Sequence, residues 1–212
     1  MFALIKREIE DNIIFYLMFA ILSLGASALM LGAVFYGDFE DPGNRAFLFI
    51  PCLLFTFIGL LGVSALGSSQ MYVDRTRKVS AFLSGLAVTR GRLFAAKITA
   101  GVIGILLMVA PIAIAAMMAV DKLAIPIPVT WEVFREVTLV VFLVYLSGYS
   151  MGLVIGWATT KFNPGLLAIA LTILFLPFVV VKGFGPEAAG WLVLFNGAVL
   201  TVSWRRFSKV WL

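Results

Sequence analysis

The sequence contains no histidine and only one cysteine among its 212 residues. The ligand sets typical of zinc sites and of histidine-bound haem are therefore missing. A Ser–His pair for intramembrane proteolysis is missing too, and Cys52 alone cannot close an intrachain disulfide. The chain also lacks the Gly-Lys dipeptide that a phosphate-binding loop requires. We therefore predict no catalytic, cofactor-binding or metal-binding residues, and no enzyme activity in this chain.

Charge is absent from six long apolar runs, and the whole chain is 62% hydrophobic and only 13% charged. A helix needs roughly 20 apolar residues to cross a hydrocarbon core about 30 Å thick. Ionisable residues inside spans mark the pathways of ion-coupled carriers, so any transport here is expected to draw its energy from elsewhere. We predict one span for each run: Ile13–Tyr36, Ala46–Val73, Ile98–Val120, Val137–Thr160, Phe162–Val181 and Ala188–Trp204.

The predicted fold class is all-α: a polytopic membrane protein that forms a single transmembrane domain over residues 1–212. Residues 1–12 precede the first span and place Phe2, Ile5 and Ile9 on one helical face, with charged residues around the rest. This pattern predicts an amphipathic helix that lies in the membrane interface.

The basic residues are distributed unevenly between the two sides of the predicted spans. One side holds 12 of the 16 Lys and Arg: Lys6, Arg7, Arg75, Arg77, Lys78, Arg90, Arg92, Lys97, Lys161, Arg205, Arg206 and Lys209. The other side holds Arg45, Lys122, Arg135 and Lys182. The positive-inside rule then places both termini in the cytoplasm of a multi-pass cell-membrane protein. Basic loops so close to apolar spans favour anionic lipid or a cytoplasmic protein as partners, and not nucleic acid.

The connection between the second and third spans is long and strongly basic. We interpret residues 74–92 as a cytoplasmic coupling segment. Asp74 can cap the start of a short amphipathic helix there, with Phe82 and Leu83 on its apolar stripe. Three basic residues lie largely off that stripe: Arg75, Arg77 and Lys78. Thr89 can cap a further helix that leads into the third span.

This connection resembles the inner loop of type 2 ATP-binding-cassette export permeases. The matching residues are Asp74-Arg75, Phe82-Leu83-Ser84, Val88-Thr89-Arg90 and Lys97, which follows the last arginine by seven residues. The sequence departs from the family pattern at Lys78-Val79, where a Gly-Thr pair is usual, and at Ala87, where Pro is usual. The amphipathic N-terminal helix, six spans and cytoplasmic termini match the family's layout over the whole chain.

The resemblance implies the permease subunit of an ATP-driven exporter. Two permease subunits, either two copies or one copy and a similar permease, would form the pathway. A separate nucleotide-binding ATPase would carry ATP and Mg. The residues implied to couple to that partner are Asp74, Arg75, Arg77, Lys78, Phe82, Leu83, Arg90 and Lys97. The alternative function is a non-transporting membrane scaffold or assembly factor that recruits a cytoplasmic partner through its basic loop.

Three glycines repeat at every fourth position of the fourth predicted span: Gly148, Gly152 and Gly156. Small residues at this spacing let two helix backbones approach closely in a membrane. We expect this ladder to pack against another helix, either within one subunit or between two subunits.

The predicted orientation can be tested by labelling single cysteines placed at Asn44, Arg77 or Lys209, in a Cys52→Ser background. A membrane-impermeant thiol reagent added outside should reach only the cysteine at position 44. After the membrane is opened, positions 77 and 209 should become reactive. Labelling of position 77 from outside in sealed cells would contradict the orientation.

Overall fold

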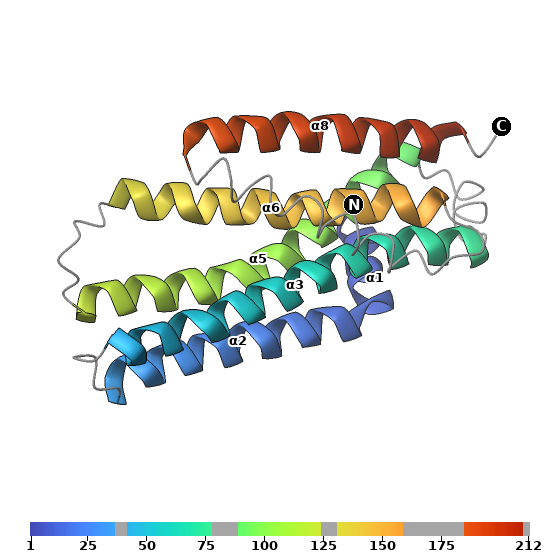
Figure 1. The fold of residues 1–212 in the computed structure, drawn as a ribbon. Helices are drawn as coiled ribbons and strands as arrows, with labels where there is room; N and C mark the ends of the chain where they lie inside the picture. Colours follow the sequence, from blue (N-terminus) through green and yellow to red (C-terminus); the bar gives the residue numbers. More distant parts are fainter. Residues whose placement is uncertain (37–41, 78–88, 124–130, 159–184, 210–212) are drawn as a thin grey trace.

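The computed structural model describes residues 1–36, 42–77, 89–123, 131–158 and 185–209, which form helices and no strand (Figure 1). The helices are α1 (Phe2–Asp11), α2 (Ile13–Tyr36), α3 (Pro42–Arg77), α5 (Arg90–Leu123), α6 (Trp131–Ala158) and α8 (Pro186–Lys209). The predicted all-α class is therefore confirmed for the part of the chain that the structure describes.

The long helices lie alongside one another as a bundle, with the short α1 crosswise near one end (Figure 1). Helix α3 packs on α6 and α2, α5 packs on α2 and α1, and α8 packs on α6. The end where α2 and α5 begin and where α3, α6 and α8 end carries most of the Lys and Arg, and we call it the basic end. The opposite, acidic end carries the starts of α6 and α8, with Glu132 and Glu136 on α6 and Glu187 on α8.

Among the described residues, four helices are long and apolar enough to cross a membrane: α2, α3, α5 and α6. This agrees with a multi-pass membrane protein. The predicted run Ala188–Trp204 lies within α8, which is not among these four helices. The predicted run Phe162–Val181 falls outside the described residues, so the number of six spans stays a prediction.

Two helices continue beyond the charge-free runs. Helix α3 runs through Asp74 to Arg77, so the hypothesis that Asp74 caps the start of a new helix is wrong. Helix α5 begins at Arg90, directly after Thr89, as predicted. The two spans, Leu54–Asp74 and Arg90–Ala119, therefore include Asp74 and Lys97, whereas the sequence predicted spans without charge. Helix α3 does not stop at its aspartate because that side chain pairs inside the bundle with Lys97.

Helix α1 ends at Asn12, which separates it from α2. The Asn12 backbone N–H donates to carbonyls of the last turn, and its side-chain amide donates to the Glu8 carbonyl at 3.0 Å. The Ser69 hydroxyl on α3 donates to Asn12 Oδ1 at 3.0 Å. The inward face of α1 differs from the sequence prediction, because Glu8 points inward beside Leu4 and Ile9. The position of α1 at a membrane interface stays a prediction.

The closest helix packing joins α3 to α6 through the predicted glycine ladder. A Cβ atom added at Gly152 would collide with the Ser64 carbonyl oxygen of α3, and it would lie 3.0 Å from the Ser68 backbone nitrogen. One added at Gly156 would lie 2.5 Å from the Ser68 carbonyl oxygen. We call this contact between α3 and α6 the seam. On its α3 side, Gly67 lies against the Tyr149 backbone of α6. The ladder thus packs against a helix of the same chain.

The prediction from this seam concerns Gly152→Leu. The α3 backbone cannot yield to the new side chain, so the two helices must separate, at a cost of about 1–3 kcal/mol in the free energy of unfolding. Melting in detergent should show the loss. Gly197→Leu on α8 is the matched control, because a Cβ atom there meets nothing within 4 Å. Equal melting temperatures for the two variants would contradict the seam.

Candidate functional site

The site with the most concentrated chemistry is a buried group of charges at the basic end, which we call the ionic cluster: Glu8, Asp74 and Lys97. The Lys97 ammonium donates to both carboxylate oxygens of Glu8, at 2.8 and 2.9 Å. It also lies 3.0 Å from Asp74 Oδ2. Only 1% of Lys97 and 7% of each carboxylate residue are exposed, so all three groups lie away from solvent.

The ionic cluster joins three helices. Glu8 comes from crosswise α1, Asp74 from the last turns of α3 and Lys97 from the second turn of α5. An ammonium has three donors, and two carboxylates from two helices surround it as acceptors. The sequence directs Lys97 inward because Leu93, Phe94 and Ala100 on the same stretch of α5 are buried.

A second layer of polar groups extends the cluster to α6. The Tyr149 hydroxyl lies 2.6 Å from Gln70 Oε1 and 2.7 Å from the Lys97 carbonyl oxygen. One hydroxyl hydrogen cannot serve two acceptors, so both contacts are satisfied only when the Gln70 amide nitrogen faces Tyr149 and donates to it. That orientation also gives the buried Gln70 Nε2 a partner, which it otherwise lacks among the described residues.

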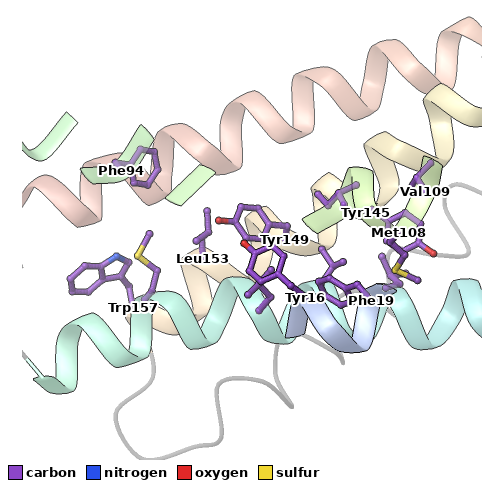
Figure 2. Close-up of a cluster of buried hydrophobic side chains, with 14 of the residues drawn as sticks. Tyr16, Phe19, Phe94, Met108, Val109, Tyr145, Tyr149, Leu153 and Trp157 are labelled. Atoms are coloured by element: carbon purple, nitrogen blue, oxygen red, sulfur yellow. The ribbon is translucent and has the colours of Figure 1, made fainter. Parts of the chain in front are cut away.

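Tyr16 brings α2 into the same region. Its hydroxyl donates to the Ala100 carbonyl oxygen of α5 at 2.8 Å. In Figure 2 the hydroxyl oxygens of Tyr16 and Tyr149 both point toward the Trp157 end of the hydrophobic core. The rings themselves pack among apolar residues such as Phe19 and Leu153. The polar layer therefore lies within the hydrophobic core, which continues past it to Phe94 and Trp157.

The charges of the cluster do not balance when all three groups are ionised, because two carboxylates face one ammonium. Burial raises the pKa of Glu8 above its ordinary value, and the nearby Lys97 ammonium opposes that shift. The bonds to Lys97 offset much of the cost of taking the carboxylates out of water. Loss of the ammonium would leave two buried carboxylates close together without a cation.

A separate polar group joins α6 to α8. Asn196 of α8 donates through its amide to the Ser147 hydroxyl at 2.9 Å and to the Leu143 carbonyl oxygen at 3.3 Å. The Ser150 hydroxyl donates to Asn196 Oδ1 at 3.1 Å. Every polar atom of the Asn196 side chain is thus bonded, which fits a structural connection between two helices.

The contacts of the ionic cluster join helices to one another. Within the described ranges, no group of three Asp, Glu, Cys or His residues could hold a metal ion. The carboxylates of the ionic cluster are turned to Lys97 and are not open to a substrate. What the cluster does is fix the relative positions of α1, α3 and α5.

The predicted coupling residues are found in different situations. Asp74 and Lys97 are paired in the ionic cluster. Arg90 Nη1 donates to the Ser208 carbonyl oxygen of α8 at 2.8 Å. Arg75 and Arg77 belong to the last turn of α3. Lys78, Phe82 and Leu83 lie outside the described residues, so the predicted coupling helix stays a prediction.

Glu8, Gln70 and Tyr149 were not predicted from the sequence as members of a site. The signal for Glu8 was mixed, because it lies one helical turn from Leu4, which packs on the core, and also three residues from the charged Asp11. Gln70 and Tyr149 gave no signal of this kind, since both lie within predicted apolar runs, where a single Gln or Tyr is common.

Comparison with protein-family models, curated proteins and solved structures found no match to this chain. The resemblance to type 2 export permeases therefore rests on the pattern of the sequence alone.

The prediction from the ionic cluster is that Lys97→Met lowers the free energy of unfolding by about 3–5 kcal/mol, because two buried carboxylates lose their cation. Denaturant unfolding in detergent measures the loss. Lys6→Met is the matched control, since Lys6 pairs with Glu10 only at 3.7 Å on the exposed side of α1.

A rescue variant separates charge from packing. Adding Glu8→Gln and Asp74→Asn to Lys97→Met removes the uncompensated charge and should recover much of the lost stability. If Lys97→Met alone unfolded like the wild type, the cluster would not be the constraint described here.

Proposed function

We propose that this chain is the membrane permease subunit of an ATP-driven exporter of the ATP-binding-cassette class. It would form the translocation pathway as a dimer, with itself or with a similar permease. It would couple through residues 74–92 to a separate nucleotide-binding subunit that hydrolyses ATP with Mg. The observation that carries the proposal is the way in which the helices on either side of this segment are joined.

Residues 78–88 connect the end of α3 to the start of α5, and the Asp74–Lys97 ion pair of 3.0 Å ties these two helix ends together. Glu8 attaches α1 to the same lysine. A force applied to residues 78–88 is therefore passed to α1, α3 and α5 together. A loop that only bound lipid would not need an ion pair between the helices that it connects.

Further contacts extend this unit to α6 and α8. Gln70 and Tyr149 link it to α6. On the other side, Phe94 of α5 packs on Phe207 of α8 with ring centres 5.6 Å apart. Trp157 of α6 packs on Phe207 as well, at 5.9 Å. Such a continuous set of contacts suits the conversion of a cytoplasmic event into helix movement.

The distribution of charge gives the orientation in this proposal. The basic end faces the cytoplasm under the positive-inside rule, so the connection 78–88 is on the side where ATP is available. Arg205 and Arg206 of α8 are exposed at this same end. They add to the basic surface without being part of the coupling segment.

The test uses affinity-tagged protein isolated from its native membranes. An ATPase subunit with a phosphate-binding loop should co-purify with the chain and hydrolyse Mg-ATP. Arg77→Glu combined with Lys78→Glu should lower that activity, since each exposed charge contributes about 0.2–1 kcal/mol. Arg205→Glu combined with Arg206→Glu is the matched control at the same end of the bundle. Phe82→Asp should have a larger effect, because it places a carboxylate on the apolar stripe.

Each failure has a distinct meaning. Equal ATPase activity in all variants would contradict the role of residues 74–92 in coupling. Recovery of a soluble partner that lacks a phosphate-binding loop, with no ATPase activity, would favour the scaffold function instead.

A further inference from the structure

Two neighbouring hollows lie at the acidic end of the bundle, remote from the ionic cluster. A groove of about 460 Å³ runs between α5 and α6, lined by apolar residues that include Leu106, Ile114 and Phe142. A second hollow of about 370 Å³ lies where α8 begins beside α6. Arg135 and Leu139 line both of them, so the two hollows share one wall.

The groove has the length and lining of a site for a hydrocarbon chain. From Leu106 to Ile114, α5 rises about 12 Å. Trp131 and Phe134 stack at the mouth of the groove with ring centres 5.9 Å apart, and 61% of Trp131 is exposed. Tryptophan favours the headgroup level of a bilayer, which places the mouth at that level and the groove below it.

The second hollow carries charges of both signs. Arg135 lines it from one position of α6 and Glu136 from the next. Neither residue belongs to an ion pair among the described side chains. Glu132, one turn earlier on α6, is exposed and adds a second negative charge nearby. A ligand headgroup that complements this surface therefore needs a negative group for Arg135 and a positive group for the carboxylates.

We propose that the two hollows form one binding site for a zwitterionic phospholipid with a primary ammonium. One acyl chain occupies the groove between α5 and α6. The phosphate lies against the Arg135 guanidinium, which matches phosphate geometry, and the ammonium lies against Glu136. A purely anionic headgroup satisfies Arg135 but is repelled by the two glutamates. The site depends on the membrane location of the chain and not on the proposed ATPase partner.

The experiment measures lipid retained by purified protein in native mass spectrometry, after incubation with phosphatidylethanolamine or phosphatidylglycerol of identical acyl chains. The wild type should retain more phosphatidylethanolamine. Arg135→Gln should lower that retention by about two- to fivefold, as expected for one exposed charge contact. Arg135→Lys should keep most of it, and Arg206→Gln, at the basic end, should keep all of it.

Two further variants test the groove and the ammonium contact separately. Ala113→Phe fills the groove and should lower the retention of both lipids, whereas Ala95→Phe on the same helix, outside the groove, should not. Glu136→Gln should reduce the preference for phosphatidylethanolamine over phosphatidylglycerol. Equal retention by wild type, Arg135→Gln and Ala113→Phe would overturn the site. A wild-type preference for phosphatidylglycerol would overturn the zwitterionic assignment.

Discussion

A lysine ammonium without access to solvent is the constraint on which the basic end of this protein depends. An isolated ammonium costs several kcal/mol to bury, so Lys97 is tolerated only where acceptors from other helices reach it. Glu8 and Asp74 provide them at 2.8–3.0 Å. The crosswise position of α1 and the extension of α3 past its apolar run both follow from this requirement. The connection between α3 and α5 starts from helix ends that are already fixed to one another.

The rest of the bundle is assembled by two other kinds of contact. The glycines between α3 and α6 have no side chain, so the two helix backbones are in direct contact. The shapes of these two surfaces fix the register of the helices. Between α6 and α8, Asn196 fixes the register through hydrogen bonds to two serines. Charge thus joins α1, α3 and α5, shape joins α3 to α6, and hydrogen bonding joins α6 to α8.

The sequence predicted what depends on composition and regular spacing. Apolar length predicted the four helices that can cross a membrane, and the spacing of Gly148, Gly152 and Gly156 predicted a close contact. It did not predict where α3 ends, because the helical role of Asp74 depends on Lys97, which lies far along the chain. Glu8 was assigned to the polar face of α1 for the same reason. A charge can be placed inward only when its partner is known, and the partners here are tertiary.

Glu8 and Lys97 are separated by 89 positions of the chain. The ionic cluster can therefore form only after Lys97 has been synthesised. Synthesis begins at the N-terminus, so α1, α2 and α3 leave the ribosome while both carboxylates still lack their cation. The two carboxylates must stay hydrated until the second turn of α5 emerges. Only then can α1 dock and the basic end close. The completion of this end of the bundle therefore waits for one residue of α5, although α1, which is made well before α5, takes part in it.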